Sequence, residues 1–125
     1  MNESPKDVVS YMVLVRGLDA AAYAPFGSRF PKARGGASLG STPREIYRVV
    51  DCERDDVSEA LAWIAEKLAG QFRVVEIGVN IQAPRNWANF DFPTQIVEAA
   101  HRWGATLKVS FMSPPTSCSP STKAE

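Results

Sequence analysis

The chain has few of the residues from which catalytic and metal sites are usually built. Its 125 residues include one histidine and two cysteines. A zinc site needs several Cys or His ligands at close spacing, and Cys52 and Cys118 stand far apart, so we expect free thiols and no metal. His101 has no nucleophile motif beside it, which leaves a Ser/His/Asp or Cys/His mechanism without a basis. The composition therefore favours a non-enzymatic protein with no cofactor.

The chain also lacks an excess of either charge, since Lys+Arg and Asp+Glu both number 14. A general nucleic-acid binder needs surplus cations to neutralise phosphates, so the balance argues against nucleic acid as a partner. No apolar run approaches the roughly 18 residues of a membrane-spanning helix, and residues 1–7 are polar. We therefore expect a cytoplasmic protein without a membrane partner.

Regular hydrophobic periods are missing from residues 26–43, which are rich in glycine and proline. The segment 35–42 nearly matches a phosphate-binding loop, but Ser41 stands where that loop needs lysine. Pro43 follows where a helix should begin, so the usual anion-binding helix end is absent. We predict a long irregular loop here and no nucleotide site.

Outside this segment the hydrophobic pattern is regular. Alternation with a period of two predicts four strands, at 8–18, 44–52, 72–82 and 105–111. Asp56 and Glu59 form a capping-box pattern before an amphipathic helix that Gly70 ends. A second long helix is predicted from Asp91 as N-cap to Gly104, with Phe92 in its buried stripe. Between the first two strands, Asp19 caps a short helical turn that Pro25 ends.

These elements predict one α+β domain over residues 1–112. The expected architecture is a two-layer sandwich, in which a four-stranded mixed sheet carries two long helices on one face. Residues 113–125 contain too little apolar surface to offset their ordering entropy, so we expect a disordered tail.

Two neighbouring segments carry opposite charge. The first holds Arg29 and Arg34 around Phe30, and the second holds Asp55 and Asp56. Such polarity either belongs to a solvated face or steers a protein partner. Phe26 and Phe30 either pack beneath the loop, which we favour, or stack on single-stranded nucleic acid.

A third candidate surface is the aromatic loop that follows the third predicted strand. It contains Arg85, Trp87 and Phe90, and arginine and aromatic residues are the usual anchors of protein interfaces. The loop either folds its aromatic rings onto the sheet edge or offers them to a partner, and both alternatives stay open. The candidate partner-binding residues are Arg29, Phe30, Arg34, Arg85, Trp87, Phe90, Asp55 and Asp56.

Three stretches resemble the bacterial family known as domain of unknown function 4279. They are residues 11–19 (Tyr-Met-Val-Leu-Val-Arg-Gly-Leu-Asp), the helix at 61–68 and the helix and strand at 96–109. The resemblance covers most of residues 8–112 and implies no catalytic residues. A weaker similarity, at the level of the fold, is to immunity proteins of polymorphic toxin systems.

We therefore expect a non-enzymatic protein-binding domain, with an immunity protein that occludes a cognate toxin as its specific form. The alternative is a small-molecule-sensing regulatory domain that binds its ligand beneath the glycine-rich loop. The identity of the partner and the oligomeric state stay open.

Overall fold

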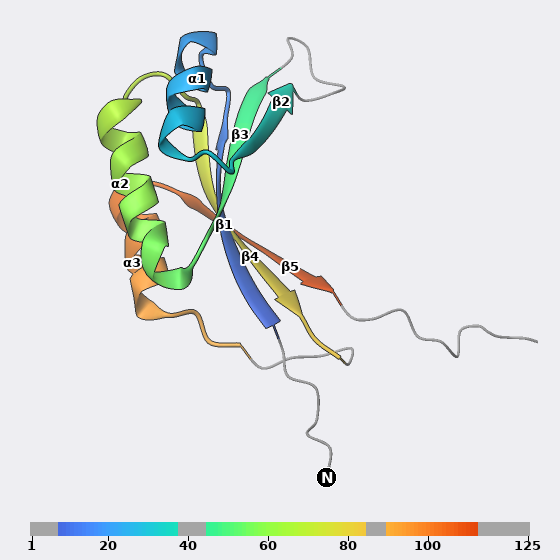
Figure 1. Cartoon of the computed structure of the whole chain (residues 1–125). Coiled ribbons are helices and arrows are strands. Elements are labelled where there is room, and N and C mark those ends of the chain that lie inside the picture. Colours follow the sequence, from blue (N-terminus) through green and yellow to red (C-terminus); the bar gives the residue numbers. More distant parts are fainter. Residues whose placement is uncertain (1–7, 38–44, 85–89, 113–125) are drawn as a thin grey trace, which may run out of the picture.

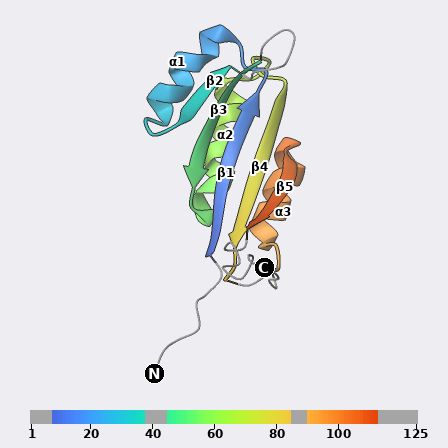
Figure 2. The ribbon, with the colours of Figure 1, turned by 90° about the vertical axis from the view of Figure 1, so that its right-hand side faces the viewer.

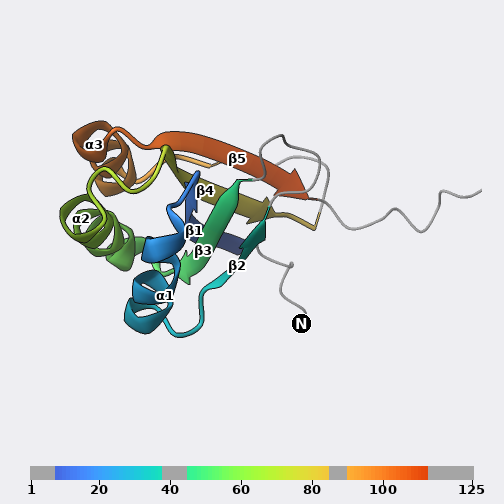
Figure 3. The same cartoon turned by 90° about the horizontal axis from the view of Figure 1, so that it is seen from above.

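Three helices cover one face of a five-stranded sheet in the computed structural model (Figures 1 and 3). The structure describes residues 8–37, 45–84 and 90–112. In chain order the elements are β1 (Val8–Arg16), α1 (Ala20–Arg29), β2 (Arg34–Ala37), β3 (Ile46–Cys52), the 3₁₀ turn η1 (Arg54–Asp56), α2 (Val57–Lys67), β4 (Val74–Gln82), α3 (Thr94–Trp103) and β5 (Thr106–Met112).

The sheet is mixed, with the strand order β2-β3-β1-β4-β5. The central strand β1 is antiparallel to both β3 and β4, and its register places Tyr11 opposite Cys52 on β3. Strand β5 joins β4 in parallel after the crossover through α3. Figure 2 looks onto the face of the sheet that the helices leave open.

The core lies between the sheet and the helices. Alternate residues of β1 and β4 point toward the helices, and Val13 and Ile77 are fully buried there. The apolar stripe of α2 supplies Leu61 and Ile64, and α3 supplies Ile96. The period-two pattern of β1 and β4 and the helical stripe of α2 therefore bury their apolar residues in one core.

The α+β class and the two-layer arrangement are confirmed, but the sheet has five strands where the sequence predicts four. The additional strand is β2, which lies inside the segment predicted to be irregular. Its sequence Arg-Gly-Gly-Ala offers no hydrophobic alternation. It forms because it pairs antiparallel with β3, with Gly36 opposite Tyr47. Residues 38–44 and the predicted tail 113–125 lie outside the described residues.

Helix α1 is also longer than predicted, because it continues through Pro25 to Arg29. A proline inside a helix removes one backbone hydrogen bond and normally destabilises it. Here Ala22 and Phe26 lie on either side of Pro25, and both are fully buried in the core. Burial of a phenylalanine side chain contributes roughly 1.5–3 kcal/mol, which offsets much of the cost of the proline.

Helix α3 begins later than predicted, at Thr94, and Pro93 occupies the N-cap position in place of Asp91. Phe92 precedes the helix and is 38% exposed, so its predicted place in the buried stripe is wrong. The predicted end of the helix is confirmed, since Gly104 adopts the left-handed conformation with a φ of 65°.

The open face of the sheet carries a row of ion pairs. Glu45 pairs with Arg73 and Arg16, and Arg16 also lies 3.2 Å from Glu76. Glu76 is only 5% exposed, and Lys108 on β5 approaches it at 3.4 Å. The row therefore links four strands or their flanks across this face and neutralises its buried carboxylate. None of the helices in the described part of the chain is long and apolar enough to cross a membrane.

Candidate functional site

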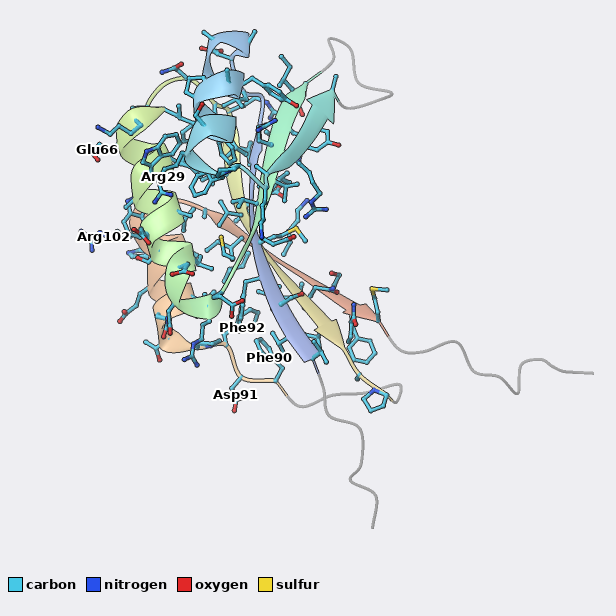
Figure 4. The ribbon with its side chains drawn as sticks, in the orientation of Figure 1. Arg29, Glu66, Phe90, Asp91, Phe92 and Arg102 are labelled. Atoms are coloured by element: carbon cyan, nitrogen blue, oxygen red, sulfur yellow. The ribbon has the colours of Figure 1, made fainter. Side chains whose placement is uncertain are left out.

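A hollow of about 620 Å³ opens beside the last residues of β3. Its walls come from the neighbouring part of β1, the end of α1 and the first turns of α2. The lining residues are Ser10, Tyr11, Arg29, Phe30, Val50, Asp51, Cys52, Glu53, Asp56, Glu59 and Ala60. We call this feature the acidic hollow. Figure 4 shows Arg29 between α1 and α2, at the upper part of this region.

Carboxylates dominate the acidic hollow. Asp51, Glu53, Asp56 and Glu59 line it, against Arg29 as the one lining cation among the described residues. Arg29 lies 3.6 Å from Glu59, and Asp51 lies 2.9 Å from Arg34. Glu53 and Asp56 have no ion pair within the described parts of the chain. The hollow therefore keeps a negative surplus that favours a cationic ligand.

The way in which α2 begins leaves the carboxylate of Asp56 exposed to the acidic hollow. It occupies the N-cap position of α2, but its side chain makes no capping hydrogen bond. The predicted capping box is therefore wrong. The preceding turn η1 already leads the chain into the helix, and Asp56 N–H is bonded to the carbonyl oxygen of Glu53. The Asp56 carboxylate is left to face the hollow.

The thiol of Cys52 is held in its protonated form. Burial is the main cause and raises its pKa to about 11, with further contributions from the nearby charges of Asp56 and Asp51. The thiol donates a weak hydrogen bond to the carbonyl oxygen of Val50, at 3.8 Å. Because the thiolate is the nucleophilic form, Cys52 presents a neutral, weakly polar wall to the hollow at pH 7.

Tyr11 lines the hollow beside Cys52, its partner in the β1–β3 register. Burial raises the pKa of its hydroxyl, and the charge of Arg54 partly opposes this effect. The protonated hydroxyl can both donate and accept a hydrogen bond. A second, smaller hollow of about 390 Å³ shares Ser10, Tyr11, Cys52 and Glu53 with the first, so the polar depression extends past Tyr11 toward η1.

The structure brings several predicted partner-binding residues to this region. Phe30 lies in the wall of the acidic hollow and packs against Phe26 and Trp63, with ring centroids 5.0 and 5.5 Å away. Arg29 sits 4.8 Å above the Phe30 ring. Phe26 is fully buried and Phe30 packs against the core, so the favoured interpretation that both rings pack inward is confirmed, although they do so from α1 and its C-cap residue.

Asp55 is engaged inside the chain. It accepts a hydrogen bond from Gln95 on α3 at 2.7 Å and another from Arg54. These two bonds, with the charge of Arg54, lower the pKa of its carboxyl. Asp55 therefore ties η1 to α3 and lines the smaller hollow.

The predicted basic and acidic segments meet each other in the structure. Arg34 pairs with Asp51 and Arg29 pairs with Glu59, so part of the expected charge separation is neutralised within the chain. The sequence does not predict either pair. Arg34 reaches Asp51 only once β2 adds to the sheet, and Arg29 and Glu59 meet only because α1 lies beside α2.

The aromatic loop is only partly described. Arg85 and Trp87 lie outside the described residues. Phe90 is half-buried and packs against the core, and its ring lies edge-on to Phe92 with centroids 5.2 Å apart. Figure 4 shows both phenylalanines between the segment that leads into α3 and the lower end of β1, with Asp91 directed away. Phe90 is not among the residues that line the acidic hollow, whereas Arg29 and Phe30 are.

Sequence reasoning places Glu53 and Glu59 in the acidic segment that could steer a partner, but it does not identify Tyr11 and Cys52 as members of a site. The period-two pattern places Tyr11 on one face of the first strand, but only the β1–β3 register sets it opposite Cys52. In the described part of the chain, no group of three or more His, Cys, Asp and Glu residues could hold a metal ion.

The fold and the acidic hollow thus define an α+β domain with an open mixed sheet and a negatively charged depression on its helical side. No family model matches the chain, and no curated protein matches it. Among solved structures, the chain is similar to the crystal structure of MupZ from Pseudomonas fluorescens, with 15% sequence identity and a TM-score of 0.48. The match covers 97% of this chain and 98% of MupZ.

Proposed function

We propose that this protein is a non-enzymatic, cytoplasmic protein-binding domain whose acidic hollow receives a basic segment of a protein partner. The observation that carries the proposal is the surplus of carboxylates in a hollow of about 620 Å³. Carboxylates form strong, charge-assisted hydrogen bonds with guanidinium groups. Glu53 and Asp56 supply such acceptors beside the aromatic rings of Tyr11 and Phe30.

The aromatic walls favour arginine over other cations. A guanidinium group can stack on an aromatic face while it pairs with a carboxylate. Arg29 already shows this combination inside the chain, since it lies over Phe30 and pairs with Glu59. An arginine of a partner would make the same kinds of contact with Tyr11, Glu53 and Asp56.

A narrower form of the proposal is an immunity protein that occludes a cognate toxin. A basic toxin surface would be guided to the acidic hollow by charge, which raises association rates and orients the encounter. Co-expression of this chain with the toxin of a neighbouring reading frame, if one is present, tests this form. Cell survival that needs Glu53 and Asp56 supports it, and survival unaffected by their loss contradicts it.

The general proposal is tested by calorimetric titration with a short arginine-rich peptide. The double variant Glu53→Gln/Asp56→Asn should lose most of the binding heat. The matched control Glu66→Gln/Asp91→Asn removes the same charge from exposed positions outside the hollow. Equal loss in both double variants would show that only net charge matters and would overturn the site.

The volume of the hollow also suits the second candidate, a small-molecule-sensing domain, because ligand pockets commonly span about 300–1,000 Å³. Its charge then calls for a small organic cation. Thermal unfolding with spermidine, free arginine and the arginine-rich peptide separates the two functions, since a bound ligand raises apparent stability. A large shift with one small cation, and none with the peptide, would favour sensing over protein binding.

A further inference from the structure

Strand β5 forms one outer edge of the sheet, on the far side of β4 from the acidic hollow. An edge strand presents unpaired backbone N–H and C=O groups, which can pair with another strand. This edge is also apolar. Val109 is 51% exposed, Phe111 43% and Met112 54%, and together they make up half of the large exposed hydrophobic residues among the described ones.

One hydrogen bond identifies the backbone groups that point outward. The carbonyl oxygen of Met112 accepts a bond from Ala83 N–H at 2.9 Å, so the backbone of Met112 faces β4. Along a strand, the N–H and C=O groups of successive residues point alternately toward one neighbouring strand and away from it. Lys108 and Ser110 therefore also bond toward β4, and the outward groups belong to Leu107, Val109 and Phe111.

The same three residues place their side chains on the helical side of the sheet. Their register aligns them with Ile77, Val79 and Ile81 of β4, whose side chains are buried there. The free edge of β5 thus combines outward backbone groups with an apolar row, whereas its polar residues Lys108 and Ser110 lie on the open face.

We propose that β5 pairs antiparallel with β5 of a second copy of this chain, with Val109 on the twofold axis. Leu107 then lies opposite Phe111 of the second copy, and Val109 lies opposite itself. Each of these pairs exchanges two backbone hydrogen bonds. The pattern is self-complementary, which a twofold interface requires, and it joins two sheets into one continuous sheet.

The lysine on this edge does not oppose the pairing. Edge lysines commonly prevent strand addition, but Lys108 lies 3.4 Å from the buried carboxylate of Glu76 on the open face. Its charge is therefore already partnered. In the antiparallel register Lys108 lies opposite Ser110 of the second copy, so the two lysines are not placed against each other.

Helix α3 extends the apolar surface beside β5. Gln95 bonds to the backbone of Arg54 and to Asp55 next to α2, so this flank of α3 faces α2. Val97 is two residues further on, about 200° around the helix, and therefore lies on the flank away from α2. It is 45% exposed. Figure 3 shows α3 and β5 along the same side of the molecule.

The dimer leaves the acidic hollow open, because no residue of β5 lines it. The proposed dimer and the proposed function are therefore independent, and a result against one does not bear on the other.

Sedimentation over a concentration series tests the dimer, with Val109→Lys and Val109→Glu as variants. The wild type should dimerise reversibly. Each variant alone should stay monomeric, because like charges would face each other at the axis. An equimolar mixture should restore a heterodimer. The exposed substitution Glu66→Lys on α2 is the control and should leave the dimer intact. A monomeric wild type, a dimer that persists in both variants, or a mixture that fails to associate would each overturn the proposal.

Hydrogen exchange on the wild type gives a test that needs no variant to fold. The amides of Lys108 and Ser110 bond toward β4 and should be protected at every concentration. The amides of Leu107, Val109 and Phe111 should gain protection only as the concentration rises. Protection of these three that does not change with concentration would overturn the proposed pairing.

Discussion

Arg29 at the end of α1 and Glu59 in α2 form an ion pair in the wall of the acidic hollow, with their charged atoms 3.6 Å apart. Arg29 also lies over the ring of Phe30. The pair joins two helices, and Arg29 is the one cation among the described residues that line the hollow. A cationic ligand would therefore compete with Arg29 for Glu59.

Replacement of Arg29 by glutamine should strengthen the binding of an arginine-rich peptide, because Glu59 is released and the negative potential of the hollow increases. The free energy of unfolding should change by less than about 1 kcal/mol, since exposed ion pairs contribute little to stability. Calorimetric titration and thermal unfolding of the same variant measure both effects. Weaker binding by Arg29→Gln would show that Arg29 itself holds the ligand.

Cys52 should resist alkylation at neutral pH, because its pKa of about 11 leaves very little thiolate. The rate should rise steeply as the pH approaches 11. Mass spectrometry of a Cys118→Ser variant follows Cys52 alone. Asp56→Asn should increase the rate at pH 8, since it removes one of the charges that raise the pKa. Rapid alkylation of the folded wild type at pH 7 would contradict the burial of this thiol.

The same pKa makes stability depend on alkaline pH. The folded protein holds the Cys52 proton more tightly than the unfolded chain, whose thiol has an ordinary pKa of 9.0. This contribution to stability is complete below pH 9 and is lost as the pH rises through 11. Cys52→Ala should therefore flatten the decrease in melting temperature over that interval, when compared with the wild type.

Much of the fold follows from hydrophobic periods alone. Strands β1, β3 and β4 and helix α2 are predicted at nearly their observed positions, because each buries one face against the same core. Strand β5 also lies within one residue of its predicted bounds, although Leu107 is its one partly buried residue. The exceptions have tertiary causes. Helix α1 passes Pro25 because Phe26 is anchored in the core, and β2 exists only through its pairing with β3.

The candidate site was less accessible to sequence reasoning. Arg29, Phe30 and Asp56 were predicted to contact a partner, and the structure places all three around one hollow. Tyr11 and Cys52 are 41 positions apart, and no local pattern reveals that the β1–β3 register sets them opposite each other. Charge runs indicate the region, but only the fold shows which carboxylates have no cationic partner among the described residues.

The two adjacent glycines of β2 should respond differently to alanine. A Cβ atom at Gly35 would lie 2.6 Å from the backbone oxygen of Tyr47 and from Cδ of Arg48. Arg48 is held 4.1 Å above the Tyr23 ring, so it cannot readily yield. We expect Gly35→Ala to lower the free energy of unfolding by about 1–3 kcal/mol.

Gly36→Ala is the matched control, because the nearest atom to its added Cβ would be 3.8 Å away. Denaturant unfolding should leave this variant within about 0.5 kcal/mol of the wild type. An equal decrease in the free energy of unfolding in both variants would mean that β2 does not lie against Arg48 as described.

The central claim is that the acidic hollow is a binding site for a basic segment. The most direct measurement is a heteronuclear NMR titration of the labelled protein with the arginine-rich peptide. The account predicts saturable shifts of the amide signals of Ser10, Tyr11, Cys52, Asp56 and Ala60, with little change in β5. The absence of saturable shifts, or shifts spread evenly over all exposed carboxylates, would contradict it.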